Sequence, residues 1–479
     1  MVGVCPEVRG RSTADAASRI SSRRVSVLRV PETVKSNKGF LRRVTAATAL
    51  GEGLDGYDLG AISVVLPLIA HELGLSALTI GLIGASTLIG IFIGSPIVGY
   101  LTDRFGRKRL FTLDVIAFVV LGLAQLVVAN AWELLAVRLL LGVAIGAEYA
   151  IGAAMMAELS PSKGRGSRLS YLQVCWYAGF LLAVVLAYVL TSAGVPWRWI
   201  LATSAVPAVL TLVLRYGLPE SPRWLMSRDR VEEARRIVNQ YLGGEAYFTA
   251  EDLAGESVRP GHFRELFSAE LRTRTSFACI FWACLVAPYF AIFTFAPLVF
   301  ASLHISDQRA GTIAANGVAA LGALAGMLLI ERVGRRRLLI SSFWITAIAL
   351  FVIGGWSGAP SLVVVVCFAV FSLFNAASGD LTGVYPSEIF PSELRASGVG
   401  LAAAASRIGA AAGTFLLPVG ISHIGVGPSV LIGGAVCVVG ALVSHLWAPE
   451  TTGLSLTRTS QFEAVKPTAP VGAAPQAST

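Results

Sequence analysis

The sequence predicts an all-helical membrane protein with twelve transmembrane helices arranged as two homologous six-helix bundles. The chain of 479 residues is 55% hydrophobic and only 14% charged, a smaller charged share than ordinary soluble proteins have. Twelve apolar stretches each reach about 20 residues, the length that spans the hydrocarbon core of a bilayer. Three motifs of the first half also return in the second half at nearly one offset.

The twelve apolar stretches follow one another in two groups of six. Short polar loops separate the members of each group, as expected of antiparallel neighbours in a helical bundle. The expected spans are 44–69, 78–101, 109–129, 134–157, 169–192, 197–217, 274–301, 308–330, 337–357, 361–385, 396–421 and 427–447.

One long connection divides the chain. It contains VEEARRIVNQYLGG, whose apolar spacing and terminal glycine pair predict a short amphipathic helix. The expected units are a solvated N-terminal tail (1–43), an N-terminal bundle (44–217), this linker (218–273), a C-terminal bundle (274–448) and a C-terminal tail (449–479).

Basic residues predict the orientation. Of the 38 Lys and Arg residues, 34 lie on one side, in the two tails, in loops or at the adjoining ends of spans; the remaining four are Arg138, Arg198, Arg309 and Arg407. The positive-inside rule therefore places both termini in the cytoplasm. Residues 1–43 contain no apolar run of the kind that a secretory signal requires, so we expect a multi-pass protein of the plasma (inner) membrane.

Several other classes of protein are disfavoured. The six cysteines are scattered without the spacing of a metal site or a disulfide framework, so we expect neither a metal nor a cofactor. We find neither a nucleophile paired with its base nor a glycine loop that could hold a phosphate, so an enzyme is disfavoured. The basic residues are separated by long apolar runs, which argues against nucleic-acid binding. A pore would require rings of equivalent groups, so a monomeric carrier of a small molecule is favoured.

The internal repeat is most specific at the cytoplasmic ends of the spans. DRFGRKR from Asp103 returns as ERVGRRR from Glu331, ELSPSKGR from Glu158 returns as EIFPSELR from Glu388, and PES at 219 returns as PET at 449. The offsets are 228, 230 and 230 residues. Repeats of this kind are typical of transporters built from two related bundles.

These motifs, together with RLLLGVAIG, LPESPRWL and YPSEIFPSELRASGVG, resemble the major facilitator superfamily, most closely its sugar-porter branch. LDGYDLG and SRIGA are instead similar to aromatic-acid and nicotinate proton symporters of the same superfamily. The resemblance covers all twelve spans. It implies a proton-coupled or facilitative carrier with one central site between two halves, worked by alternating access.

The resemblance also implies a cytoplasmic gate that locks the outward-open state. Asp103 is expected to accept hydrogen bonds from backbone amides at the start of the third span, and Gly106 to supply backbone freedom. The expected partners of DRFGRKR and of its second-half copy are Glu158 and Arg165, Glu220 and Arg223, and Glu388 and Arg395. The alternative is that these motifs are topology signals alone. The gate candidates are Asp103, Arg104, Gly106, Arg107, Glu158, Arg165, Glu220, Arg223, Glu331, Arg332, Gly334, Arg335, Glu388 and Arg395.

Three acids interrupt the first apolar stretch. Glu52, Asp55 and Asp58 are spaced by three residues, so a helix places them along one flank, where all can avoid lipid. A carboxylate at the centre of a membrane helix costs roughly 3 kcal/mol and normally faces the interior of the bundle. The resemblance implies that Asp58 carries the proton and pairs with Arg138 of the fourth span. A static ion pair that orients the first and fourth spans is the alternative. Either Asp55 or Glu52 is a second proton site or lies near the interface.

Further polar and aromatic residues are candidates for the substrate site. Polar groups at membrane depth are expected to serve function, and Gln173 matches a sugar-porter position that binds hydroxyls. Arg407 either binds a carboxylate in bidentate fashion or pairs with Asp380. The candidates are Gln173, Trp176, Tyr177, Glu148, Tyr289, Phe293, Asn316, Asn375, Asp380 and Arg407.

The substrate remains open between a sugar-like molecule and an organic acid. The seventh span has no Gln, and the tenth places Asp380 and Gly383 where hexose carriers have Pro and Trp. Pro288 and Pro297 predict that the seventh span is broken. Proton symport of a small polar metabolite is the favoured function; a facilitative uniporter, an exporter and a non-transporting substrate sensor are the alternatives.

The orientation is tested by labelling from the two sides of the membrane. The variant Ser306→Cys, in the loop after the seventh expected span, should react with a membrane-impermeant thiol reagent added to intact cells. Tags at both termini and a protease site introduced within 245–260 should be reached only from the cytoplasm. Labelling of the unsubstituted chain is the control, and an unreactive position 306 beside reactive tails would overturn this topology.

Overall fold

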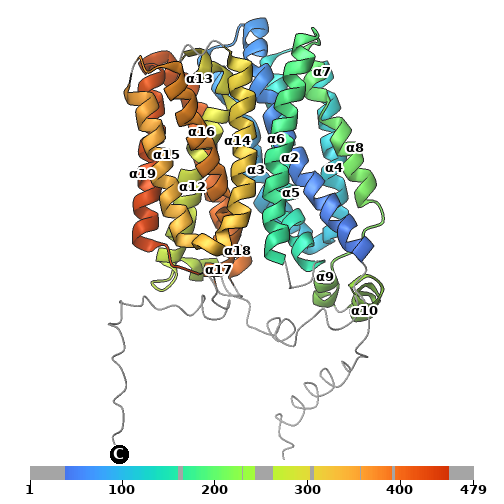
Figure 1. Ribbon diagram of the computed structural model, residues 1–479. Helices are drawn as coiled ribbons and strands as arrows, with labels where there is room; N and C mark the ends of the chain where they lie inside the picture. The colour runs from blue at the N-terminus through green and yellow to red at the C-terminus, as the bar shows by residue number, and fades with distance from the viewer. Residues whose placement is uncertain are drawn as a thin grey trace, which may run out of the picture.

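The computed structural model describes residues 38–159, 165–228, 230–242, 263–302, 307–356, 358–390 and 394–451. Within this part of the chain, long helices run roughly parallel to one another, and short helices lie at one end of the bundle (Figure 1). Residue 306, the stretch 245–260 and most of both expected tails lie outside the described residues.

The N-terminal half contains six spans on one side of the molecule (Figure 1). Its sixth span is interrupted at Thr203 and Ser204, a break that the sequence did not predict. The helices are α2 (Lys38–Leu73), α3 (Ala77–Phe105), α4 (Arg107–Ala124) with the 3-10 turn η1 (Gln125–Val127), α5 (Ala131–Glu158), α6 (Arg165–Ser192), α7 (Trp197–Ala202) and α8 (Ala205–Arg215).

The C-terminal half repeats this arrangement on the other side. Pro288 lies inside α12, and the seventh span is broken at Phe295, between the two prolines that predicted a break. The helices are α12 (Arg272–Thr294), α13 (Ala296–Ser302), α14 (Gln308–Val333), α15 (Arg335–Gly355), α16 (Ser361–Gly379), α17 (Leu381–Ile389), α18 (Arg395–Ile424) and α19 (Val426–Trp447).

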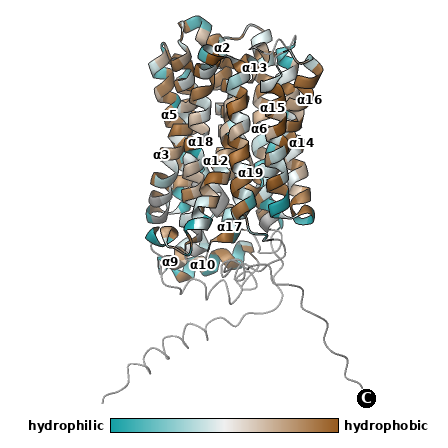
Figure 2. Cartoon of the chain, turned by 90° about the vertical axis from the view of Figure 1, so that its left-hand side faces the viewer, coloured by the Kyte–Doolittle hydropathy of each residue, from teal (hydrophilic) through white to brown (hydrophobic). Residues whose placement is uncertain are grey.

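Eleven helical stretches of the described residues are long and apolar enough to cross a membrane. The 28-residue helix α5, with Arg138 and Glu148 in its interior, supplies the remaining span of the twelve. Large apolar side chains such as Val127 and Leu446 are exposed on the outer surface, and Figure 2 shows apolar residues covering the outer faces of the helices. This is the surface that a bilayer requires, because lipid offers no partner for polar groups.

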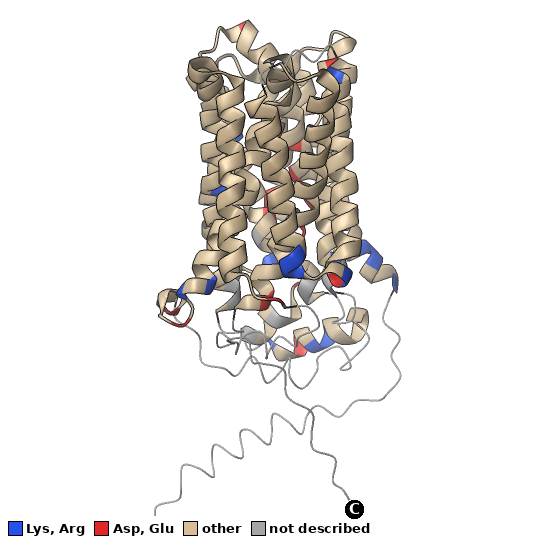
Figure 3. Cartoon of the chain, turned by 60° about the vertical axis from the view of Figure 1, so that its left-hand side comes forward, with Lys and Arg blue, Asp and Glu red and all other residues tan. Residues whose placement is uncertain are grey.

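The segment between the halves begins with three short helices below the bundle. They are α9 (Pro222–Ser227), α10 (Val231–Ile237) and the π-helical turn η2 (Val238–Leu242); the 3-10 helix η5 (Phe263–Phe267) precedes α12. Arg230 donates two hydrogen bonds to Glu233 at the start of α10, which holds the pKa of that carboxyl below its usual range. Figure 3 shows charged residues gathered at this end and a few acids inside the bundle.

Short polar side chains begin several helices. The side chain of Asn130 accepts hydrogen bonds from the backbone N–H groups of Trp132 and Glu133 at the start of α5. Asp307 caps α14 in the same way through the N–H of Ala310. These caps satisfy amides that have no partner within the helix, so the start of each helix is encoded locally.

Glycines bring α3 and α5 into close contact. A Cβ atom on Gly142 would lie 2.1 Å from the carbonyl oxygen of Thr87, and one on Gly90 would lie 2.2 Å from that of Leu139. Gly146, four residues after Gly142, packs against the backbone of Ser95 in the same way. Small residues at this spacing let two membrane helices approach closely, and this contact sets the position of Arg138, which precedes Gly142 by one turn.

The variant Gly142→Ala should lower the melting temperature of the purified protein, because its methyl group has no room against Thr87. Forcing a methyl group into a packed site costs about 1–3 kcal/mol. Gly317→Ala in α14 is the matched control, since a Cβ atom there meets nothing within 4 Å and Ala favours a helix. Equal melting temperatures for the two variants would contradict the packing argument.

Candidate functional site

The predicted proton pair is formed between α2 and α5. Arg138 Nη2 lies 3.1 Å from Asp58 Oδ2, and both side chains are 1% exposed. Among the described residues, the guanidinium of Arg138 has this ion pair and no hydrogen bond. The Asp58 carboxylate is therefore the group that compensates a buried cation, and moving one of the two helices would leave both charges without a partner.

The other two predicted acids of α2 lie one and two helical turns away from this pair. Asp55 is fully buried, and neither of its carboxylate oxygens has a hydrogen-bond partner in the described part of the chain. Glu52 is also buried. Glu52, Asp55 and Asp58 are thus all buried away from lipid, as their spacing predicted. The fourth acid of α2, Glu72 near its end, is exposed and pairs with Arg198.

A second buried ionic cluster lies beside these acids in the N-terminal half. Arg215 at the end of α8 pairs with Glu148 of α5 at 2.6 Å and with Asp114 of α4 at 3.2 Å. Its guanidinium also lies 3.5 Å from the centre of the Phe111 ring. The cluster connects three helices through charges that are almost completely buried.

The sequence analysis counted Arg215 with the basic residues of the loop after the sixth span, although it lies near the end of the expected span 197–217. The structure places it inside the bundle, where it is 2% exposed. Asp114 was missed altogether. The signal for Asp114 was available: it is an acid inside an apolar stretch, the same observation that drew attention to Glu148. Its partner was not visible, because the two residues are about a hundred positions apart in the chain.

A small central cavity lies where the two halves meet. Its volume is about 50 Å³, far below the 300–1,000 Å³ of ordinary ligand pockets, so the halves are closed around it in this conformation. Both halves contribute to its wall: Tyr149, Gln173, Trp176, Tyr177, Trp282, Leu285, Val286, Tyr289, Phe290, Asn375, Gly379, Thr382 and Arg407.

Six predicted substrate-site residues line this cavity: Gln173, Trp176, Tyr177, Tyr289, Asn375 and Arg407. Four other candidates do not. Glu148 belongs to the Arg215 cluster, Asn316 donates to the carbonyl oxygen of Thr312 in its own helix, and Phe293 stacks on Tyr289 at 4.3 Å. Asp380 is buried beside the cavity, with both carboxylate oxygens lacking a hydrogen-bond partner among the described residues.

Aromatic rings close the cavity from both halves. Trp176 and Tyr177 of α6 contact Tyr289 of α12, with ring centres 6.1 and 5.7 Å apart. The guanidinium of Arg407 in α18 lies 4.5 Å from the centre of the Tyr149 ring of α5. These contacts join the two bundles directly, so any opening of the centre must break them.

Arg407 therefore does not form the proposed bridge with Asp380, because no ion pair joins them among the described residues and the Tyr149 ring is the neighbour of the guanidinium. A cation over an aromatic face is attracted less strongly than a cation beside a carboxylate. The guanidinium keeps donors that an anionic or hydroxylated ligand in the cavity would meet.

The sequence analysis missed much of the C-terminal wall. Only Tyr289 of this face was predicted. Trp282, Leu285, Val286 and Phe290 share one face of α12 with it, at the spacing i, i+3, i+4 and i+8 with Tyr289 at i+7. That periodicity could have identified the face, but it could not show whether the face met the cavity or lipid. Tyr149, Gly379 and Thr382 carried no comparable signal.

The second-half gate motif forms a network at the cytoplasmic ends of the helices. Arg335 pairs with Glu331 at 2.8 Å and with Glu388 at 3.3 Å. Glu388 also accepts a hydrogen bond from the hydroxyl of Thr451. Glu388 was an expected partner of this motif, and its pair with Arg335 agrees with that prediction. The side chain of Arg395, another expected partner, lies outside the described set.

An equivalent glutamate in each half binds the turn between the second and third helices of that half. Glu220 accepts hydrogen bonds from the backbone N–H groups of Arg107 and Lys108 at 3.0 and 3.1 Å. Glu450, 230 residues later, accepts from those of Arg335 and Arg336 at 3.1 and 3.2 Å. The amides that we assigned to Asp103 at the start of the third span are therefore bound by Glu220.

The glycines of these turns are required for two reasons. Gly106 and Gly334 have φ values of 97° and 91°, a region that side chains disfavour. A Cβ atom at these positions would also lie 2.6 Å from Glu220 Oε2 and 2.8 Å from Glu450 Oε2. The glycine allows the carboxylate to reach the first amides of the next helix, where the helix dipole favours negative charge.

The remaining gate candidates contribute less to the described network. Arg104 and Arg332 are exposed, and Arg107 is half-buried. The side chains of Asp103, Glu158, Arg165 and Arg223 lie outside the described set, so the gate contacts expected of them stay predictions.

Two bundles closed on a small central site define a membrane transporter of the major facilitator fold. A solved structure of the proton:xylose symporter XylE of Escherichia coli, bound to 6-bromo-6-deoxy-D-glucose, matches with a TM-score of 0.74. The two sequences are 24% identical, and the match covers 88% of this chain and 99% of that chain.

The chain belongs to the family described as "Sugar (and other) transporter", whose model matches residues 44–462. The putative metabolite transport protein YaaU of Escherichia coli K12 is 37% identical over 424 residues, covering 88% of this chain and 95% of that protein. The inner membrane metabolite transport protein YgcS of the same organism is 35% identical over 418 residues, covering 87% and 93%.

Removing the centre of the buried cluster should destabilise the protein strongly. Arg215→Met leaves Asp114 and Glu148 buried without their cation, and breaking a buried ion pair costs about 3–5 kcal/mol. The melting temperature of the purified protein should fall markedly. Arg230→Met, which breaks an exposed pair on α10, should leave it unchanged; equal effects of the two variants would contradict a supporting role for the Arg215 cluster.

Proposed function

We propose that this protein is a proton-coupled symporter that moves a small polar metabolite across the plasma (inner) membrane by alternating access. The observation that carries the proposal is the Asp58–Arg138 pair, a completely buried carboxylate whose charge is compensated by one cation on another helix. A buried group of this kind is typical of ion and proton pathways in membrane proteins. Both termini and the linker lie on the cytoplasmic side in this proposal.

The coupling follows from ordinary electrostatics. A cation beside a buried carboxylate favours the ionised form, whereas a dry interior without such a partner favours the protonated form. A movement of α2 relative to α5 therefore changes the proton affinity of Asp58. If substrate binding favours one arrangement of these helices, proton binding and substrate binding are coupled, and the coupling acts equally in both directions. Asp55, unpartnered one turn away, is a candidate for a second proton.

The residues that line the central cavity support the inference that the substrate is polar. Trp176 Nε1 and Tyr289 OH have no hydrogen-bond partner in the described part of the chain, although buried donors are normally satisfied. Gln173, Asn375 and Arg407 line the same space and add further donors. This set suits a molecule rich in hydroxyl groups, in agreement with the family and with the xylose carried by XylE. Arg407 also suits a carboxylate, so an organic acid is the second candidate.

The cytoplasmic network supports alternating access. In this proposal the bundles 44–217 and 274–448 rock as units about the central site. Arg335, Glu331 and Glu388 act as a gate in the second half, and Glu220 and Glu450 hold the turns of both halves rigid. Facilitative uniport, export and substrate sensing would use the same bundles without proton-driven accumulation, and flux into proteoliposomes separates them.

Asp58→Asn should abolish accumulation driven by a pH gradient, because the amide keeps the shape of the side chain but cannot exchange a proton. Proteoliposomes and a panel of labelled sugars, polyols and carboxylic acids supply the assay, with and without the gradient. Exchange of a substrate down its own gradient should survive in part, since a permanently neutral side chain still permits the conformational change.

Asp55→Asn is the matched variant, one helical turn earlier on the same helix, and should be milder. Accumulation that persists in Asp58→Asn but disappears in Asp55→Asn would move the proton site to Asp55 and contradict the role of Arg138. Substrate flux in the parent chain that is insensitive to the gradient would favour a uniporter.

A further inference from the structure

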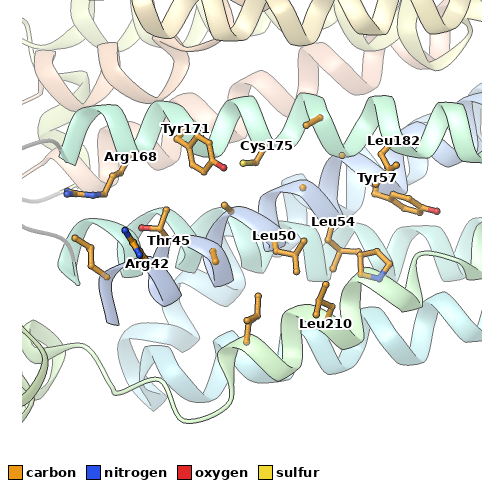
Figure 4. A pocket seen from close by; sticks show the side chains of 18 of the residues that line it. Arg42, Thr45, Leu50, Leu54, Tyr57, Arg168, Tyr171, Cys175, Leu182 and Leu210 are labelled. Carbon is orange, nitrogen blue, oxygen red and sulfur yellow. The ribbon is translucent and has the colours of Figure 1, made fainter. Parts of the chain in front are cut away.

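A second and much larger cavity opens on the outer face of the N-terminal bundle. It is a groove of about 830 Å³ between α2, α6 and α8, within the size range of ordinary ligand pockets. Figure 4 shows its length, with Arg42 and Arg168 at one end and Leu54, Leu210 and Leu182 towards the other. None of the described residues lines both this groove and the central cavity.

Positive charge gathers at one end of the groove. Lys38 and Arg42 come from the first turns of α2, and Arg168 comes from the first turn of α6 on the facing side. Lys38 and Arg42 form neither a hydrogen bond nor an ion pair with the part of the chain that the structure describes. The described lining includes no Asp or Glu. Lys38 and Arg42 are therefore two cations at this end that no anion of the described residues neutralises.

Unlike Arg42, the neighbouring Arg43 forms hydrogen bonds with the protein. Its guanidinium donates to the carbonyl oxygens of Leu214 and Tyr216 at the end of α8, where a cation suits the negative end of a helix. The fold thus uses Arg43 to bind the end of α8, whereas Arg42, the preceding residue of α2, points to the groove (Figure 4).

The rest of the groove is apolar and has the depth of one leaflet. Leu50, Leu54, Leu182, Leu210 and Leu214 line it. Between Arg42 and Leu54 the helix rises about 18 Å at its usual rise per residue, and half of a typical hydrocarbon core is about 15 Å. A chain that starts at the basic end would therefore reach the middle of the membrane along this trough.

The groove also lies behind residues that matter for transport. Tyr171, Cys175 and Ala178 of α6 face the groove, whereas Gln173, Trp176 and Tyr177 on the same helix line the central cavity. Leu54 and Tyr57 line the groove from α2 and neighbour Asp55 and Asp58 in sequence. A molecule in the groove would contact both helices that carry the site of the proposed function.

We propose that this groove is a binding site for an anionic phospholipid, with the phosphate held by Lys38, Arg42 and Arg168 and one acyl chain lying along the apolar trough. Basic residues at the membrane surface attract anionic headgroups, while the apolar length excludes a soluble phosphate as the preferred ligand. The site does not depend on which substrate the protein carries or on whether it couples transport to protons.

The test uses the full-length protein, purified in a mild detergent and titrated with phosphatidylglycerol or phosphatidylcholine of identical acyl chains. Native mass spectrometry counts the lipids bound to each molecule. The parent protein should retain one phosphatidylglycerol in preference to phosphatidylcholine. Each basic residue near a membrane surface contributes enough for about a five-fold change, so Lys38→Ala with Arg42→Ala should weaken phosphatidylglycerol binding roughly 30-fold.

Two further variants separate the charge from the trough. Arg109→Ala with Arg337→Ala removes two exposed cations from equivalent turns of the two halves and should change binding less than two-fold. Ala178→Trp places a ring in the trough, where Ala178 is exposed, and should weaken binding of both lipids while the basic end stays intact. Melting temperatures of all variants report whether they fold.

Equal binding of the two lipids by the parent protein would overturn the proposal. So would an equal loss in the Arg109 and Arg337 control, because the effect would then be general surface charge. Undiminished binding in Ala178→Trp, or competition by glycerol phosphate at the concentration of the lipid, would show that an anion binds without the acyl chain. The result for Asp58→Asn tests proton coupling and does not change the expected lipid binding. Each of the two proposals can therefore be contradicted without contradicting the other.

Discussion

The bilayer imposes one constraint on which the rest of this structure depends: charge inside it must find its partner within the chain. Arg138 with Asp58, and Arg215 with Asp114 and Glu148, meet this requirement by joining helices that are remote in sequence. Removing one member leaves a buried charge, which costs far more than an exposed pair contributes. The ionic partners therefore fix how α2, α4, α5 and α8 are rotated, and close glycine contacts then determine how near they come.

The two halves share a fold but divide the chemistry. The described buried acids lie mainly in the N-terminal half, whereas the C-terminal half supplies Arg407 and one long face of α12. The halves meet through weak contacts, such as the Arg407 guanidinium over the Tyr149 ring and the aromatic cluster around Tyr289. Contacts of this strength can be broken and remade, while the strong ion pairs stay within one half. This division is what a carrier that rocks two stable bundles requires.

The repeat is preserved most closely where the backbone needs it. Glu220 and Glu450 bind the first amides of α4 and α15 in the same way, and Gly106 and Gly334 adopt the same left-handed conformation beside them. Away from these turns the halves differ freely, and the groove beside α2 has its basic end only where Lys38, Arg42 and Arg168 converge. Both halves require a rigid turn between two helices, so that turn is the same in each. The side chains elsewhere differ because the two halves serve different functions.

The sequence by itself determined the spans, the repeat and the flank of α2 that carries the acids, because span length, hydropathy and helical spacing are local properties. It also indicated Asp58 and Arg138, since charges at membrane depth are conspicuous. It misplaced Arg215, overlooked Asp114 and did not anticipate the break between α7 and α8. It assigned Asp380 to Arg407 as one of two possibilities, whereas the ring of Tyr149 lies there. Only the tertiary structure decided these partners, because they depend on the rotation and separation of helices a hundred or more residues apart, which no local pattern specifies.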